Sequence, residues 1–277
     1  MHVPHWLYNL WGILMIVVMK TYYIFILIAL FWSCTKNDEQ GSPSQSETFF
    51  PTSITVAATA NSQVTYRISY NQNMFIEGIE TIRTTDGDTN TISSTFMYNS
   101  NHLLSEVQST NIADGSAYKF LFSYNDLDAI ESLSMIIDTE QQNIGIKYLG
   151  PATNSYELEG DEFLFPMAWD FDEDNVLQQL TLGESMFNIV HDGVKKGPFY
   201  DLEPQPALVI WHTLFFYLAH YELLYFSPFT LNKITTPDDT LNALDKVWDE
   251  DKNLVSFKLK FNASFSTILY TISYEQF

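Results

Sequence analysis

A serine in a glycine-containing turn is the first candidate for catalysis in this chain. Ser185 lies in the segment Gly183-Glu184-Ser185-Met186-Phe187, which approaches the Gly-x-Ser-x-Gly turn that presents the nucleophile of many hydrolases. Phe187 replaces the closing glycine, so this strained turn cannot form and Ser185 is interpreted as an ordinary residue. The sequence also has no P-loop and no dinucleotide-binding fingerprint. We therefore predict no catalytic residue and no cofactor.

Two histidines and a glutamate share one apolar segment, and all three side chains are possible metal ligands. His212 and His220 are eight positions apart, and Glu222 is two positions further on. On a helix, residues eight apart differ by about 80° in direction and lie two turns from each other. A helical metal site needs ligands three or four positions apart. We interpret both histidines as core or boundary residues and predict no metal site.

Acidic residues cluster at several points, most densely at 170–174 and 249–251. Loops of this kind can bind Ca²⁺, but the twelve-residue pattern with a central glycine and a final glutamate is absent. Two carboxylates at short separation could hydrolyse glycans, yet no pair is distinguished by its sequence context. We interpret the clusters as groups that solvate turns and protect sheet edges. A carboxylate-dependent hydrolase acting on glycans remains an alternative.

The single cysteine, Cys34, has the most specific predicted chemistry. It follows an apolar run, residues 22–32, which begins after Lys20 and ends at Ser33. A basic residue, a short apolar run and a small residue form the plan of a secretory signal. The run is too short to span a bilayer alone. We predict that residues 1–33 are a signal segment whose true start is Met19. An uncleaved anchor with a buried cysteine is one alternative, and a long signal anchor over residues 2–33 is a second.

The segment Leu30-Phe31-Trp32-Ser33-Cys34 resembles the lipobox of bacterial lipoproteins, with Phe31 in place of the common leucine. This resemblance implies that the Cys34 thiol carries lipid and becomes the mature N-terminus. Residues 34–50 follow as a polar stretch with Gly, Ser and Pro, which is typical of a flexible tether. Within it, residues 36–39 are similar to the acidic export signal of surface lipoproteins in the Bacteroidota, although a solvated linker would look the same. We expect a lipid-anchored protein of the outer membrane, exposed at the cell surface.

Charge and composition exclude several classes of protein. The formal net charge is −21, from 13 Lys+Arg and 34 Asp+Glu, which opposes binding to nucleic acid or to anionic headgroups. A single cysteine allows neither an intrachain disulfide nor a cysteine-based zinc site. With 277 residues, 46% of them hydrophobic, the chain can bury a sizeable core. The expected partners are the membrane, through the N-terminal lipid anchor, and a glycan, a peptide or an envelope protein; no nucleic acid is expected.

A weak repeat organises the body of the chain. Its unit is an aromatic residue followed by Asn or Asp, with apolar residues six and nine positions after the aromatic. The residue two positions before the aromatic is often apolar too, and a period of two indicates a strand. The Asn or Asp then opens a polar stretch that favours a turn, so each unit is predicted to be a β-hairpin. The five aromatic positions are Tyr70, Tyr98, Tyr124, Phe171 and Trp248.

The spacing of the two apolar residues inside the unit is compatible with two arrangements of the strand. Positions six and nine differ by an odd number, so a regular strand would send them to opposite faces of the sheet. Either a β-bulge brings both to one face or both faces of the sheet are buried.

These units resemble YD-type repeats, most closely those of a family of uncharacterised Bacteroidota surface lipoproteins. The similarity covers roughly residues 60–277, and a second family-like stretch runs from His191 to Tyr200 and continues at 227–234. There Phe229 and Thr230 stand where relatives have asparagines. The resemblance implies a fold and a location, and it assigns no ligand.

The most hydrophobic part of the body, residues 207–226, is long enough to cross a bilayer. His212, His220 and Glu222 argue against that, because a central glutamate costs about 2 to 3 kcal/mol in a membrane. We predict a buried helical insertion, about 206–229, that begins after Pro206 as helices often do.

The predicted fold is mainly β: antiparallel hairpins, built from repeats, form a curved sheet that wraps the helical insertion. The predicted domain spans residues 51–277. The expected function is that of a non-enzymatic, envelope-tethered binding or structural module for a glycan, a peptide or an envelope protein. A glycan hydrolase and a periplasmic envelope-assembly partner are the alternatives.

Overall fold

Alternating apolar and polar residues form sixteen antiparallel strands in a computed structural model that describes residues 48–59, 61–137, 140–159, 166–216, 226–263 and 266–277. The predicted signal segment, Cys34 and nearly all of the predicted tether lie outside these residues. The strands are β1 (Phe49–Thr59), β2 (Ser62–Tyr70), β3 (Ile76–Thr85), β4 (Asp88–Tyr98), β5 (Leu104–Asn111), β6 (Ala117–Tyr124), β7 (Ile130–Ile137), β8 (Glu140–Tyr148), β9 (Ser155–Glu159), β10 (Met167–Phe171), β11 (Leu177–Leu182), β12 (Ser185–Lys196), β13 (Phe229–Thr235), β14 (Thr240–Trp248), β15 (Leu254–Phe261) and β16 (Thr267–Gln276).

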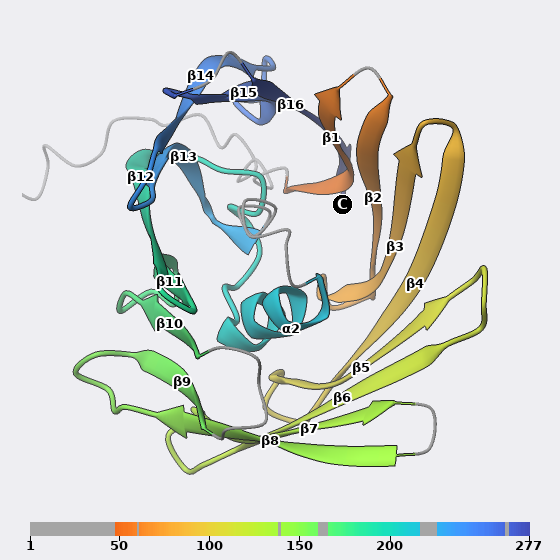
Figure 1. Cartoon of the computed structure of the whole chain (residues 1–277), viewed down its shortest axis with the longest axis vertical. Helices are drawn as coiled ribbons and strands as arrows, with labels where there is room; N and C mark the ends of the chain where they lie inside the picture. Colours follow the sequence, from red (N-terminus) through yellow and green to blue (C-terminus); the bar gives the residue numbers. More distant parts are fainter. Residues whose placement is uncertain (1–47, 60, 138–139, 160–165, 217–225, 264–265) are drawn as a thin grey trace, which may run out of the picture. The chain divides into compact units, whose positions relative to one another are not determined.

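The strands close into a barrel in which each strand pairs with its neighbours in sequence and the last strand pairs with the first (Figure 1). Ile54 of β1 lies opposite Tyr66 of β2 on one side and Ile272 of β16 on the other. The prediction of a mainly β, antiparallel fold is confirmed, but the predicted curved sheet is corrected to a closed barrel. Closure depends on whether the two outermost strands meet, and no local sequence period encodes that meeting.

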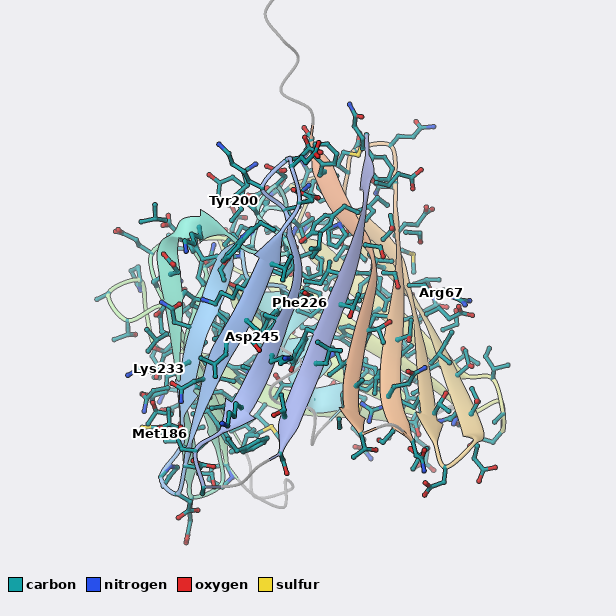
Figure 2. The ribbon with its side chains drawn as sticks, turned by 90° about the horizontal axis from the view of Figure 1, so that it is seen from above. Arg67, Met186, Tyr200, Phe226, Lys233 and Asp245 are labelled. Carbon is teal, nitrogen blue, oxygen red and sulfur yellow. The ribbon has the colours of Figure 1, made fainter. Side chains whose placement is uncertain are left out.

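The barrel carries its apolar side chains inside and its polar side chains outside. Along β2, Tyr66 and Ile68 are buried, whereas Gln63 and Arg67 are exposed. Ion pairs lie on the outer wall, such as Arg67 with Glu80 at 2.9 Å. Figure 2 shows Arg67 and Lys233 projecting away from the wall. The wall therefore presents charged and hydrogen-bonding groups to its surroundings.

The helix α2 (Pro206–Phe216) lies in the lumen, where Figure 1 shows it inside the ring of strands. Its residues from Ala207 to Thr213 are all buried. Trp211 meets Phe96 of β4 edge to face at a ring-centroid distance of 4.9 Å. Trp169 of β10 donates a hydrogen bond from Nε1 to Thr213 Oγ1 at 3.2 Å. A helix that is apolar on all sides is stable here because the barrel wall surrounds it.

The predicted insertion, about 206–229, is too long at its C-terminal end. Helix α2 begins at Pro206 as expected, but β13 already begins at Phe229 and Pro228 cannot continue a helix. Residues 217–225, which include His220 and Glu222, lie outside the described part of the chain. Within the described residues, no helix has the length and hydropathy needed to cross a membrane.

Candidate functional site

The candidate site is built on five turns of one design, each opened by the Asn or Asp of a repeat unit. Asn99 shows the design. Its Oδ1 accepts hydrogen bonds from the backbone N–H groups of Asn101 at 2.9 Å and Leu103 at 3.0 Å. Its own N–H donates to the carbonyl of Leu103 at 2.9 Å. A short side-chain acceptor thus replaces the backbone partners that the turn lacks.

The other four units repeat this geometry. Their first residues are Asn71, Asn125, Asp172 and Asp249, and each accepts a hydrogen bond at Oδ1 from the N–H four positions later. The residue three positions after each Asn or Asp has a positive φ, at 56° to 67° in the five turns. Residues other than glycine rarely adopt this left-handed backbone conformation, because it brings Cβ too close to the backbone. The side-chain hydrogen bonds hold the turns in this conformation. These positions are Met74, His102, Asp128, Asn175 and Lys252.

A β-bulge follows every one of these turns. Of the two arrangements that the repeat spacing allowed, a bulge or burial of both sheet faces, the structure has the bulge. Tyr98 lies opposite Leu104 and Met97 lies opposite Glu106, so Ser105 is an extra residue on β5. The same shift occurs in the other four hairpins. Because of the bulge, the apolar residues at both positions of each unit face the lumen, as Leu104 and Val107 do at 0% exposure.

Three tyrosines of the repeat, together with Tyr274, which is not part of it, join neighbouring strands. Tyr98 donates a hydrogen bond from Oη to the carbonyl of Ile76 at 3.0 Å, and Tyr124 donates to Leu104 at 2.6 Å. Tyr70 donates to Pro51 at 2.9 Å, and Tyr274 of β16 donates to Leu254 at 3.1 Å. Each tyrosine therefore links the end of its strand to the start of the strand that precedes it in sequence.

Burial makes the phenol groups of these tyrosines weaker acids. Desolvation, the largest cause, raises the pKa of Tyr70, Tyr98, Tyr124 and Tyr274 far above the usual value of 10. It raises the pKa of Tyr156 to about 12. The hydroxyl groups thus remain neutral donors over the physiological range.

All five turns lie at the same rim of the barrel, because they follow even-numbered strands of an antiparallel barrel. We call this end the turn rim. Helix α2 also starts there and is pinned by Gln205, which is only 7% exposed. Gln205 Oε1 accepts a hydrogen bond from Leu104 N at 2.9 Å, and Nε2 donates to the carbonyl of His102 at 3.0 Å. No sequence motif marks Gln205, although the adjacent Pro206 predicted the start of a helix.

A pocket of about 450 Å³ opens between the start of α2 and four loops of the turn rim. We call it the rim pocket. Its aromatic walls are Tyr124, Tyr148 and Tyr156, of which the last two lie 5.1 Å apart between ring centroids. The volume is within the range of small-ligand sites, which combine aromatic walls with a few convergent polar groups.

The polar groups of the rim pocket are amides and carboxylates, and among its described lining residues none is Lys, Arg or His. Hydrogen bonds hold two of the amides in place, since Asn154 Nδ2 donates to the Asp172 carbonyl at 2.7 Å and to Asn175 Oδ1 at 3.0 Å. The carboxylates are exposed and extend toward solvent. The pocket therefore offers hydrogen-bond acceptors and repels anions. The amides are Asn101, Asn154, Asn175 and Gln205, and the carboxylates are Asp128, Glu173 and Glu203.

Of the five aromatic residues predicted from the repeat, only Tyr124 lines the rim pocket. Tyr70 and Tyr98 support the turn rim through their hydrogen bonds. Phe171 is buried in the core, and the ring of Trp248 lies 4.8 Å from Lys195 Nζ. The structure thus places these residues as parts of the scaffold, while Cys34 lies outside the described residues.

The residues considered for catalysis or metal binding are scattered. Ser185 is exposed at the rim opposite the turn rim. His212 packs 4.7 Å from the Phe216 ring, and burial, with Arg83 as a smaller cause, lowers its pKa to about 3. The described residues contain no group of His, Cys, Asp and Glu that could hold a metal ion.

One histidine–serine contact has the distances of a nucleophile and its base. His191 Nδ1 lies 3.1 Å from Ser227 Oγ, and Nε2 lies 3.1 Å from the Leu177 carbonyl. The cavity beside them is only about 10 Å³, which leaves no room for a substrate. Ser227 Oγ also donates to the Phe229 carbonyl at 2.9 Å. The contact therefore connects β12 to the segment that returns from α2 and serves packing.

No family model matches the chain, and no curated protein is significantly similar to it. Two solved structures that match are porin-like proteins of Bacteroides species. The protein from Bacteroides uniformis is 14% identical over 81% of this chain and 98% of its own, with a TM-score of 0.38. The protein from Bacteroides vulgatus is 11% identical over 82% of this chain and 99% of its own, with a TM-score of 0.40. The term porin-like describes those two proteins.

Proposed function

We propose that this protein is a lipid-anchored module of the outer membrane, exposed at the cell surface, which binds glycans in the rim pocket without transforming them. The observation that carries the proposal is the pocket itself, in which tyrosine rings and fixed amides surround about 450 Å³. Aromatic faces pack against the apolar faces of sugar rings, and amides and carboxylates satisfy hydroxyl groups.

The barrel wall supports anchoring by lipid on Cys34. A wall that faces lipid needs an outward apolar band, whereas this wall carries ion pairs such as Lys258 with Asp245 at 2.7 Å. In the described part of the chain, α2 and a cluster of buried apolar side chains pack inside the lumen, which favours binding at the rim over transport through the barrel. Acyl chains on Cys34, at about 0.8 kcal/mol per buried methylene, would supply the attachment that the wall does not.

Binding is favoured over hydrolysis by the exposure of the carboxylates. A glycosidase needs one carboxylic acid in an apolar environment, where it stays protonated and can donate. Asp128, Glu173 and Glu203 are all exposed. They suit the acceptance of hydroxyl hydrogens better than proton donation.

Glycan binding is tested by screening the detergent-solubilised full chain on a glycan array. Tyr148→Ala removes one aromatic wall and is expected to weaken binding by roughly tenfold. Tyr200→Ala is the matched control, since Tyr200 is exposed outside the pocket and packs on Lys196. Absence of any bound glycan, or equal binding by the Tyr148 variant, would refute the site.

The anchor is tested by metabolic labelling with an alkyne fatty acid. The wild-type chain should be labelled and sediment with membranes, whereas Cys34→Ala should be unlabelled and released. Protease treatment of intact cells then separates a surface protein, which is cleaved, from a periplasmic assembly partner, which is protected. Equal labelling of both variants would contradict the anchor.

A further inference from the structure

A second hollow adjoins the rim pocket on the outer side of the turn rim. It measures about 560 Å³ and lies between the turns that open at Asn99 and Asn125. We call it the outer hollow. Its walls include Ser105 and Ser123, which are outward residues of β5 and β6. Hydroxyl, amide and carboxylate groups therefore line this hollow as well.

The two hollows share three lining residues, Asn101, Tyr124 and Asp128. Between the two turns, Asn101 Nδ2 lies 3.5 Å from Asp128 Oδ1, at the long limit of a hydrogen bond. Both residues are exposed, so a ligand hydroxyl can replace this contact at small cost. Tyr124 is fixed by its 2.6 Å hydrogen bond to the Leu104 carbonyl. A rigid aromatic side chain thus connects the two hollows.

We infer that the rim pocket and the outer hollow form one continuous site for a linear, uncharged oligosaccharide that crosses the rim between Asn101 and Asp128. This inference rests on the proposed glycan binding and adds the form of the ligand. A single sugar would occupy only one hollow, whereas a chain can contact both. The described lining residues of both hollows include acids and no Lys, Arg or His, so polyanionic chains are disfavoured.

The inference is tested by the dependence of affinity on chain length. Calorimetry on the detergent-solubilised full chain would compare cello-, malto- and manno-oligosaccharides of one to six units. For the series that binds, affinity should rise by at least roughly tenfold between the dimer and the hexamer. Ser123→Trp, which places a bulky ring in the outer hollow, should remove that gain and leave dimer binding within about twofold.

Ser93→Trp is the matched control, because Ser93 is an exposed residue of β4 that lines neither hollow. It should leave both affinities unchanged, and thermal unfolding would verify that both variants fold. Equal affinities for dimer and hexamer, or an equal loss of both in Ser123→Trp, would overturn the continuous site while leaving glycan binding intact. If no oligosaccharide binds the wild-type chain, the proposed function itself fails.

Discussion

At the scale of single residues, the turn rim depends on five Asn or Asp side chains that substitute for backbone partners. Asn99→Ala would leave the N–H groups of Asn101 and Leu103 without their acceptor. We expect a loss of about 1 to 3 kcal/mol in the free energy of unfolding, from two hydrogen bonds of about 0.5 to 1.5 kcal/mol each. Chemical denaturation measures this loss.

Asn99→Asp is the control for that prediction. Aspartate keeps Oδ1, and Asp172 already performs the same role with hydrogen bonds of 2.9 and 3.0 Å. We expect Asn99→Asp to unfold within about 0.5 kcal/mol of the wild type. Equal loss in both variants would show that the side-chain acceptor is not what stabilises the turn.

The buried tyrosines predict a fall in stability at alkaline pH. Burial raises the pKa of Tyr98 above its usual value, so the unfolded chain loses this proton at a lower pH than the folded chain. The folded state therefore binds more protons above about pH 10, and stability decreases as pH rises from there. Denaturation midpoints measured between pH 8 and pH 11 should show this decrease.

Tyr98→Phe separates the two contributions of the hydroxyl group. It removes the hydrogen bond to Ile76 and should cost about 1 kcal/mol at pH 8. It also removes one raised pKa, so the alkaline decrease should be shallower than in the wild type. If stability fell with pH as steeply in the variant as in the wild type, the Tyr98 phenol would titrate alike in the folded and unfolded states.

At the scale of elements, α2 acts as the core of the barrel. Trp211 is fully buried, and Trp211→Ala should destabilise the protein by about 3 to 5 kcal/mol because the wall cannot collapse onto the cavity. Thermal or chemical unfolding measures this cost. Ile112→Ala, at a residue that is 62% exposed, should change the free energy of unfolding by less than about 0.5 kcal/mol.

A conservative variant adds a sharper test of the same helix. Within the described residues, Trp211 Nε1 is buried and has no hydrogen-bond partner. Trp211→Phe removes this polar group and keeps an aromatic ring, so it should cost clearly less than the alanine variant. A similar loss of stability in both variants would contradict this expectation.

At the scale of the whole molecule, closure brings the ends of the barrel unit together. Phe277 N donates a hydrogen bond to the Thr48 carbonyl at 3.1 Å. We expect a circular permutant of residues 48–277, joined by a short Gly/Ser linker and opened between Asp86 and Gly87, to fold cooperatively with a β-type circular dichroism spectrum. Opening between Phe120 and Leu121, in the middle of β6, should prevent folding. The opposite result would argue against a closed barrel.

The sequence by itself determined the local features of this protein. An aromatic residue followed by Asn or Asp predicted the hairpins, because Oδ1 reaches amides only two and four positions away. Residues such as Ile76 and Ile79 were identified as apolar partners of the unit, and both are buried. Pro206 marked the start of α2 for an equally local reason, since proline suits the first turn of a helix.

The tertiary structure alone decided how these pieces meet. The choice of a bulge depended on which face of the sheet is buried, and the bulge brings both apolar positions to the face that lines the lumen. Gln205 and Leu104 are 101 residues apart in sequence, and no periodic pattern links them. The rim pocket exists because four separate loops and the start of α2 converge at one rim. Contacts between distant segments depend on closure and strand tilt, which a local period of two cannot encode.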